Sequence, residues 1–330
     1  MQSLLFSCVM TFLTSCGAVP AVRALAWRMG AVDVPRDGRR LHSKRMPRCG
    51  GLAIFAALTV GALLMGTAAG KVGAILAGGL VLLAVGLADD VYTLSPALKL
   101  TGQVIAAYIA SKPVESARDA LGLLWIVLIS NAHNFIDGMD GLMTGTAVIE
   151  CAALGWMLFE GAWTGEANLI LLLGCACAGF WLFNRHPASI FAGDCGSCTV
   201  GYLLGACSLP LMRGGGGILE GVAPLFVFAY PLTDLFTAVA RRILRLRSPF
   251  DADRGHLHHR LFAAGLTQRQ CVWVLHLQAV LLATVAALMR MRDAHLFAAA
   301  VCLLTVAWMM AVRRGILFIS EKREKRLKNT

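Results

Sequence analysis

The sequence predicts an all-α protein that crosses a membrane many times. Of its 330 residues, 58% are hydrophobic, and the mean hydropathy is +0.69. This composition is too apolar for a water-soluble globule. Apolar runs close to the roughly 20 residues that a helix needs to cross a bilayer follow one another along the chain. No long polar linker interrupts them, so we expect one integral membrane domain over residues 1–330.

Eleven apolar segments are candidate spans of a polytopic helical bundle. Each is apolar along nearly its whole length and is bounded by polar, glycine or proline residues. The segments lie near residues 3–25, 50–70, 72–90, 97–111, 120–136, 139–160, 167–184, 195–212, 217–240, 269–289 and 294–312.

The Lys and Arg residues predict the orientation of these spans. With the N-terminus outside, 24 of the 30 basic residues fall on inner segments and 6 on outer ones. Basic residues are retained on the cytoplasmic side, so we expect the basic tail 313–330 to be cytoplasmic, in a bacterial inner membrane. The net charge of +11 then reflects contact with anionic lipid, and we expect no nucleic-acid partner.

This orientation places four polar clusters at cytoplasmic ends of spans. They are Asp89-Asp90, the segment 131–141, the surroundings of Asp194, and a basic loop at 245–268. An acidic side chain at the centre of a membrane helix costs about 2.5 to 3.5 kcal/mol on insertion scales, so acids near helix ends are functional candidates. We expect one shared site at the cytoplasmic face.

The segment 131–141 carries the densest set of polar groups. Asn131, Asn134, Asp137 and Asp140 recur every three positions, a spacing that turns steadily around an α-helix. Only a tightened or broken turn aims them in one direction, and the glycines within the segment allow one. The alternative is that these residues cap helix ends.

The other acids have similar alternatives. Asp89 and Asp90 repel each other unless a cation or the nearby Lys99 offsets their charge, and a solvated helix terminus is the other interpretation. Asp194 precedes a helix start, where it suits either an N-cap or a Mg²⁺ ligand, because Mg²⁺ binds through few carboxylates and bridges to phosphates.

The basic loop contains Arg254, His256, His258 and His259. Closely spaced histidines bind Zn²⁺ in many proteins. The surrounding basic residues favour an anion instead, and His and Arg beside carboxylates are typical of a site that binds phosphates directly and through Mg²⁺.

Six segments in chain order resemble the signature motifs of the polyprenyl-phosphate N-acetylhexosamine-1-phosphate transferase family, over about residues 30–262. They are Asp33-Val-Pro35 with His42 and Pro47-Arg-Cys-Gly-Gly51; Asp89-Asp90; Asn131-Ala-His-Asn-Phe-Ile-Asp-Gly-Met-Asp-Gly-Leu142; Phe183-Asn-Arg-His-Pro-Ala188; Phe191-Ala-Gly-Asp-Cys-Gly-Ser197; and Ser248-Pro-Phe-Asp-Ala-Asp-Arg-Gly-His-Leu-His-His259. The resemblance implies transfer of a sugar 1-phosphate from a UDP-activated N-acetylhexosamine to a polyprenyl phosphate. The products are UMP and a lipid diphosphate sugar, and the cofactor is Mg²⁺, which Mn²⁺ is expected to replace.

The resemblance also implies roles for individual residues. Asp194 is the metal ligand, and Asp89 and Asp90 deprotonate or orient the attacking lipid phosphate. Asp137 and Asp140 shape the nucleotide and metal pocket, Asn134 and Asn184 contact uridine, and Phe191 stacks on uracil. The diphosphate is bound by Arg254, His256, His258 and His259, of which the last two are also catalytic. Further substrate contacts come from His42, Asn131 and Lys99.

Within the family, Leu257 interrupts the histidine run. This pattern is similar to the branch that starts O-antigen, enterobacterial common antigen or wall teichoic acid, and it favours UDP-N-acetylglucosamine as the donor. Ala192 departs from the Met that is common in the family at the uracil site. The alternatives are phospho-MurNAc-pentapeptide transfer and, from another class, a proton-coupled transporter; a homo-oligomer is left open.

Overall fold

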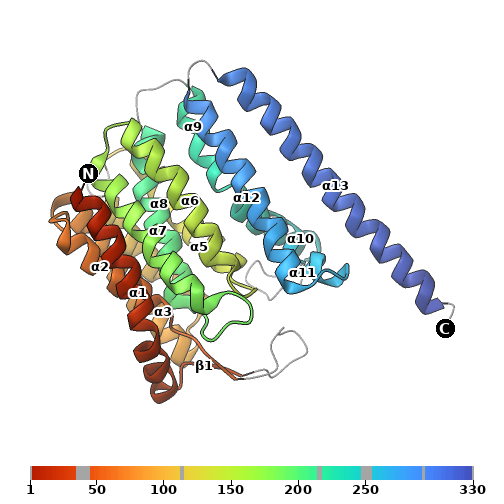
Figure 1. The fold of residues 1–330 in the computed structure, drawn as a ribbon, viewed down its shortest axis with the longest axis horizontal. Coiled ribbons are helices and arrows are strands. Elements are labelled where there is room, and N and C mark those ends of the chain that lie inside the picture. The colour runs from red at the N-terminus through yellow and green to blue at the C-terminus, as the bar shows by residue number, and fades with distance from the viewer. Residues whose placement is uncertain are drawn as a thin grey trace.

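The protein is a bundle of long helices with one very small sheet (Figure 1). The computed structural model describes residues 2–34, 45–111, 115–213, 218–246, 255–291 and 294–328. The elements are α1 (Gln2–Met29), β1 (Val32–Asp33), β2 (Met46–Pro47), α2 (Gly51–Leu64), α3 (Gly70–Tyr92), α4 (Pro96–Ser111), α5 (Ala117–Ile136), α6 (Leu142–Glu160), α7 (Thr164–Asn184), α8 (Asp194–Arg213), α9 (Ile218–Val227), α10 (Ala229–Leu244), α11 (Leu257–Ala263), α12 (Gln268–Arg290) and α13 (His295–Lys328). The predicted all-α class is confirmed.

The helices follow the eleven predicted spans in order, with α9 and α10 together covering the span at 217–240. These two helices are bent by 73° at their junction. Among the described residues, seven helices are long and apolar enough to cross a membrane, or eight with the bent pair counted as one span. The chain is therefore a multi-pass membrane protein, while the count of eleven stays a prediction.

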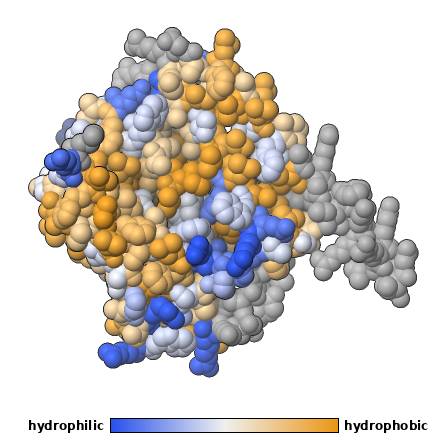
Figure 2. Space-filling view, in the orientation of Figure 1, coloured by the Kyte–Doolittle hydropathy of each residue, from blue (hydrophilic) through white to orange (hydrophobic). Residues whose placement is uncertain are grey.

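The outer surface of the bundle suits contact with lipid. Figure 2 shows apolar residues covering much of the visible face. Large apolar side chains on the spanning helices are exposed, such as Leu121, Leu124 and Trp273 at 65%, 61% and 70%. Exposed apolar area of this extent has no driving force to be buried when hydrocarbon is the solvent.

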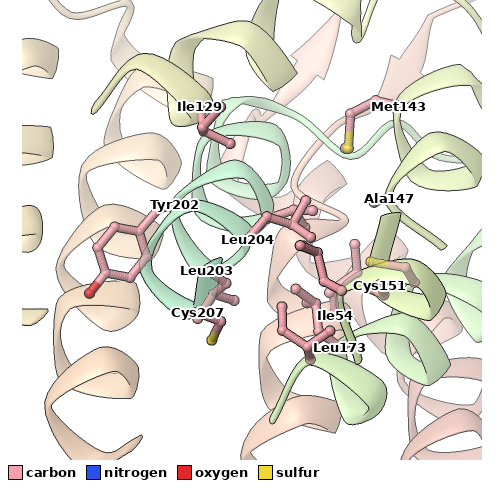
Figure 3. Close-up of a cluster of buried hydrophobic side chains, with 14 of the residues drawn as sticks. Ile54, Ile129, Met143, Ala147, Cys151, Leu173, Tyr202, Leu203, Leu204 and Cys207 are labelled. Carbon is pink, nitrogen blue, oxygen red and sulfur yellow. The ribbon is translucent and has the colours of Figure 1, made fainter. Parts of the chain in front are cut away.

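Helix α8 forms the centre of the bundle and packs against α2, α3, α5, α6, α7 and α9. In Figure 3, Leu204 of α8 points toward side chains of neighbouring helices that include Ile54 and Leu173, whereas Tyr202 points to the opposite side. The Tyr202 hydroxyl is buried and lies 3.0 Å from the carbonyl oxygen of Ile75, to which it donates a hydrogen bond. This bond satisfies a polar group that would be costly if left unpaired in the interior.

Three glycines let α2, α3 and the start of α8 approach very closely. A Cβ atom at Gly51 or at Gly86 would overlap the backbone of Cys195, and one at Gly196 would meet the backbone of Gly51. Side chains at these positions would push the helices apart. The glycines therefore fix where α8 begins relative to the end of α3.

The connections that carry the predicted site residues lie at one end of the bundle. α11 and the connections after α5 and α7 are found toward the lower end in Figure 1, away from the N-terminus. α5 ends at Ile136 and α6 begins at Leu142, so the helix is broken where a break was predicted. Gly141 caps the start of α6 with φ at 75°, a conformation that favours glycine.

Candidate active site

Lys99 of α4 lies between two carboxylates at the junction of α3 and α8. Its Nζ is 3.1 Å from Oδ2 of Asp89 and forms a short ion pair with Oδ2 of Asp194. The second oxygen of Asp89 accepts a hydrogen bond of 2.6 Å from the backbone N–H of Leu94. Buried charges are stable only when they are paired and hydrogen-bonded, and this arrangement satisfies both conditions. It fixes the two carboxylates at one place.

Asp90 caps the N-terminus of α8. Its Oδ1 and Oδ2 accept hydrogen bonds from the backbone N–H groups of Asp194, at 3.0 Å, and Cys195, at 3.2 Å. Arg48 joins the group, with Nε 3.4 Å from Asp90 Oδ1. Asp194 is itself the first residue of α8, so the capping role that the sequence left open for Asp194 belongs to Asp90. The Asp194 carboxylate is held by Lys99 instead.

The Arg48 guanidinium also donates hydrogen bonds to carbonyl groups at the end of α3. Its Nη2 donates to the carbonyl oxygens of Asp89, at 3.4 Å, and Asp90, at 3.1 Å. The last carbonyls of a helix have no partner within the helix. Arg48 follows β2 directly, so the segment containing the first predicted motif is tied to the paired aspartates.

The turn between α5 and α6 presents Asp137 and Asp140. Oδ2 of Asp140 lies 2.7 Å from Nδ1 of His186 and accepts a hydrogen bond of 3.1 Å from the backbone N–H of Ala188. Asp137 forms the C-cap position of α5. Burial raises the pKa of Asp137 to about 8, and the nearby carboxylates, Asp194 foremost, add to the shift. At neutral pH this group therefore carries a proton.

The carboxamides of α5 are fixed by neighbouring helices. Nδ2 of Asn131 donates to Oε1 of Gln103 on α4 at 2.6 Å, and Gln103 returns a bond of 3.3 Å. Nδ2 of Asn134 donates to the Ser197 hydroxyl on α8 at 2.9 Å. Both side chains remain partly exposed, so each has surface to offer a ligand while its orientation is set by the protein.

Asn184 is used within the protein. Its Oδ1 accepts a hydrogen bond from the Thr144 hydroxyl at 2.8 Å, and its Nδ2 donates to the carbonyl of Ile190 at 3.0 Å. The residue is 2% exposed, so little of its side chain is accessible for the predicted uridine contact. Phe191 is partly exposed, and its backbone N–H donates to the Pro47 carbonyl at 2.9 Å, which places its backbone beside the first motif.

Asp234 of α10 anchors the histidine segment. Its Oδ2 lies 2.7 Å from Nδ1 of His256, and its Oδ1 accepts a hydrogen bond of 2.8 Å from the Leu257 N–H. The ring of His256 also stacks on His258 with centroids 5.5 Å apart, and it meets the edge of Phe135 on α5 at 5.4 Å. A carboxylate on one ring nitrogen fixes the tautomer and orientation of the imidazole.

His258 is buried and has no hydrogen-bond partner for either ring nitrogen among the described residues. Its Nε2 lies against Gly138, where a Cβ atom would overlap it. Burial lowers the pKa of His258 to about 3, and the neighbouring His259 and His256 add to the shift. The ring is thus neutral at pH 7, and it can donate one hydrogen bond and accept another but supplies no charge. The ring of His259 lies 4.4 Å from it.

Comparison with known proteins decides the family. The glycosyl transferase family 4 model matches residues 72–212. A probable undecaprenyl-phosphate N-acetylglucosaminyl 1-phosphate transferase of Bacillus subtilis is 36% identical over 287 residues, which cover 82% of this chain and 80% of that protein. The chain belongs to the polyprenyl-phosphate N-acetylhexosamine-1-phosphate transferase family.

Two further relatives of this transferase come from distant bacteria. The decaprenyl-phosphate N-acetylglucosaminephosphotransferase of Mycobacterium tuberculosis is 33% identical over 79% of this chain and 76% of its own length. The undecaprenyl-phosphate alpha-N-acetylglucosaminyl 1-phosphate transferase of Escherichia coli is 27% identical over 81% and 78%. The similarity extends over most of the bundle and is not confined to the motifs.

The structure gathers most of the predicted site residues of the transferase at one end of the bundle. His42 and Arg254 lie outside the described residues, so their predicted contacts with substrate stay predictions. Asp137 connects the groups, since its pKa responds to the charges of Asp194, Asp90 and Asp140, while Gly138 contacts His258. The predicted catalytic and substrate-binding roles of these residues likewise remain predictions.

Two buried acids inside the predicted spans of the transferase were not predicted as site residues. Asp234 is 3% exposed, and Glu150 is fully buried beside His133, with Glu150 Oε2 2.7 Å from His133 Nε2. Both acids lie within segments that were predicted only as spans. The rule that an acid inside a membrane span indicates function would have found them if it had been applied to every span.

The transferase offers oxygen ligands that fit Mg²⁺. Among the described residues, no group of three or more His, Cys, Asp and Glu side chains is arranged to hold a metal ion. Mg²⁺ commonly binds through one or two carboxylates and completes its shell with waters and substrate phosphates, so a smaller set suffices. Burial is the main cause of the raised pKa of Asp137, and the charges of Asp194, Asp90 and Asp140 add to it, so a cation near these carboxylates would be favourable. Asp194 would hold the ion, and Asp137, whose pKa responds to the charge of Asp194, would face the same cation.

Proposed function

We propose that the protein transfers N-acetylglucosamine 1-phosphate from UDP-N-acetylglucosamine to undecaprenyl phosphate or a similar polyprenyl phosphate. The observation that carries the proposal is the lysine-held pair Asp89 and Asp194 at the start of α8, within a chain whose relatives are named for this transfer. The product would be the lipid diphosphate sugar that begins a cell-surface polysaccharide. The relatives' names favour this function over pentapeptide transfer and over a proton-coupled transporter.

The reaction exchanges one phosphoryl bond for another. An oxygen of the lipid phosphate attacks the phosphorus that bears the sugar, a new P–O bond forms, and the bond to the uridine phosphate breaks with UMP as the leaving group. Little covalent work is required of the protein, because such transfers depend mainly on positioning and charge neutralisation. The apolar outer surface of the bundle lets the prenyl chain remain in the bilayer.

Each group of residues has a role in this proposal. Asp89, which Lys99 and the Leu94 N–H hold in place, orients the attacking lipid phosphate or accepts its proton. Asp90 acts on the same step through its capping of α8, so we assign it a positioning role. Bound Mg²⁺ would neutralise phosphate charge at Asp194.

The histidine segment receives the diphosphate in this proposal. His256, oriented by Asp234, and His259 face the same region as His258. Because the His258 ring is neutral at pH 7, it serves as a hydrogen-bond donor to a phosphate oxygen and not as a cation. The positive charge must then come from Mg²⁺ and from basic side chains.

A panel of UDP-sugars tests the function directly. The purified protein, reconstituted with undecaprenyl phosphate, should release UMP with UDP-N-acetylglucosamine, and excess EDTA should stop the release. Added Mg²⁺ or Mn²⁺ should restore it. UMP release that persists at the full rate in EDTA would remove the metal from the proposal. Release only with UDP-MurNAc-pentapeptide would move the protein to the other branch.

The proposal also requires the site to face the cytoplasm, where UDP-sugars are made. Ser95, beside the Asp89 end of α3, and Thr164, at the start of α7, are both exposed and lie at opposite ends of spanning helices. In a cysteine-free background, Thr164→Cys should react with an impermeant thiol reagent on spheroplasts, whereas Ser95→Cys should react only after the membrane is opened. The reverse labelling pattern would place the site on the outer face, where the UDP-sugar donor is not made, and would contradict the proposal.

A further inference from the structure

A cavity lies beside the candidate active site, between the end of α7 and the first turns of α12. It has a volume of about 510 Å³, and its walls include Trp181 and Arg185 from the α7 side and Arg269 and Trp273 from α12. Asp140 also lines it, but the residues around Asp194 and Lys99 do not. The cavity is therefore lined by a different set of residues from the carboxylate cluster, although Asp140 belongs to the candidate active site.

The walls of this cavity, which we call the arginine pocket, contain two arginines, Arg185 and Arg269. Arg185 stacks over the Trp181 ring at 5.6 Å, and Arg269 donates one hydrogen bond of 3.4 Å to the carbonyl of His186. Within the part of the chain that the structure describes, neither guanidinium forms an ion pair with a carboxylate. The one carboxylate in the walls, Asp140, is already bound by His186. Two guanidinium groups facing a common cavity are typical of a site for an anion.

The surroundings of the pocket show what kind of anion it suits. Leu182 of α7 and Trp273 of α12 are 44% and 70% exposed, and both belong to helices that are apolar enough to span the membrane. Apolar and indole surface thus leads outward from the charged pocket along the spanning helices. Tryptophan at the end of a membrane helix is typical of the headgroup level. A ligand with a phosphate and hydrocarbon chains matches both parts.

We propose that the arginine pocket binds the phosphate of an anionic glycerophospholipid, whose acyl chains lie along the outer faces of α7 and α12. The pocket shares Asp140 and His186 with the candidate active site. A bound phosphate on Arg185 and Arg269 would therefore stabilise the connection after α7, which holds Asp140 through His186 and Ala188. The lipid site rests on this geometry alone, and only its effect on turnover depends on the proposed function.

Lipid binding is tested without catalysis. The full-length protein in detergent is titrated with phosphatidylglycerol and, separately, with phosphatidylcholine, and retained lipid is counted by native mass spectrometry. The wild type should prefer one phosphatidylglycerol by about tenfold or more, the scale expected for charge-assisted hydrogen bonds. The R185Q/R269Q variant should lose that preference. An unchanged preference in this variant would overturn the proposal.

A matched control removes the same charge elsewhere. Arg28 and Arg245 are exposed near the ends of α1 and α10 and do not line the arginine pocket, so R28Q/R245Q should keep the preference. An equal loss in both double variants would mean that anionic lipid responds only to net charge, and the pocket would be rejected. If R185Q/R269Q does not fold, R269Q alone serves, since the side chain's hydrogen bond of 3.4 Å to His186 contributes little.

Two further arms separate the lipid from the sugar nucleotide. Inorganic phosphate and UDP-N-acetylglucosamine are added as competitors, and neither should displace phosphatidylglycerol at millimolar concentration. Displacement by the nucleotide, or a rise in its KM for R185Q/R269Q in vesicles of phosphatidylcholine alone, would assign the pocket to the donor and sink the lipid proposal. Failure of lipid binding with normal UMP release would leave the proposed function intact.

Discussion

The two halves of the candidate active site differ in how their polar groups are satisfied. At the junction of α3 and α8, the Asp90 carboxylate caps the start of α8 and Asp194 is paired with Lys99. Around the α5–α6 turn, Asp137 has its pKa raised to about 8, and His258 has no hydrogen-bond partner among the described residues. The first half is complete without substrate, whereas the second is not.

This difference teaches which part of the site the ligands complete. Unpaired buried polar groups are costly, and a protein retains them where a ligand supplies the missing partner. The α3–α8 junction therefore acts as a fixed frame that presents Asp194 to a cation, and the α5–α6 turn with the histidine segment is the part that substrate completes. Substitutions in the frame and in the turn should fail in different ways.

The largest effect is expected in the frame, from Asp194→Asn. The change keeps the shape of the side chain but removes the charge that Lys99 and a cation would share. Turnover should fall by more than about a hundredfold, the scale for loss of one electrostatic stabiliser in a transition state. UMP release by the purified variant measures it. Glu160→Gln, at an exposed position, is the control and should retain activity; near-normal turnover of Asp194→Asn would leave the residue a merely structural role.

A smaller effect is expected from Asp234→Asn, because Asp234 acts only through its contacts with the histidine segment. The amide can still accept from the Leu257 N–H, but it no longer attracts the His256 ring as a carboxylate does. Loss of a hydrogen bond to a charged group costs about 1.5 to 3 kcal/mol, or about ten- to hundredfold in kcat/KM. The loss should appear in kcat/KM for the wild-type substrates, because the 2.7 Å contact between the Asp234 carboxylate and the His256 ring orients the ring. Asp234→Ala should lose more activity than Asp234→Asn, and equal, small losses would show that the pair only holds α11 in place.

Asp137 in the α5–α6 turn should make the affinity for Mg²⁺ depend on pH. The pKa of Asp137 is raised from its usual range to about 8, so the side chain is protonated at neutral pH and must lose that proton to face a cation. The Mg²⁺ concentration for half-maximal UMP release should therefore rise about tenfold for each pH unit below about pH 8, and level off above it. Asp137→Asn should flatten the dependence. A flat dependence in the wild type would mean that Asp137 stays protonated during the reaction.

The smallest effect is expected where a neutral bond orients a ligand contact. Ser197→Ala removes the acceptor for Asn134, whose amide lies 2.9 Å from the hydroxyl. A neutral hydrogen bond contributes about 0.5 to 1.5 kcal/mol, so KM for the donor should rise by about two- to tenfold with kcat nearly unchanged. Steady-state kinetics distinguish this from a loss of kcat, which would place Ser197 in the chemistry.

The helical architecture could be predicted from the sequence because the hydrocarbon core of a membrane constrains the backbone that crosses it. A spanning backbone must satisfy its own hydrogen bonds, so apolar runs become helices, and the predicted segments coincide with helices. The bend of 73° between α9 and α10 was not predicted, because both helices continue the same apolar run. Pro224 and Pro231 flank the junction and are the signal for it.

The site was predicted as a set of residues but not as a set of contacts. Periodicity located the break between α5 and α6, since four polar residues cannot face one way on an intact helix. It could not assign the capping of α8 to Asp90, because that bond joins residues 104 apart in sequence. The Asp234 to His256 pair was missed for a related reason: its acid lies in an apolar run whose hydropathy concealed it.

The glycine contacts among α2, α3 and α8 have a consequence for biogenesis. Gly51, Gly86 and Gly196 must meet before Asp194 has its neighbours, and they are spread over most of the first two thirds of the chain. During synthesis, each helix enters the bilayer in turn, so a nascent chain that stops before α8 holds Asp89 and Asp90 without the helix start that Asp90 caps. The competent form therefore arises late, after translation passes Arg213, and until then two acids must wait at the membrane surface beside Lys99.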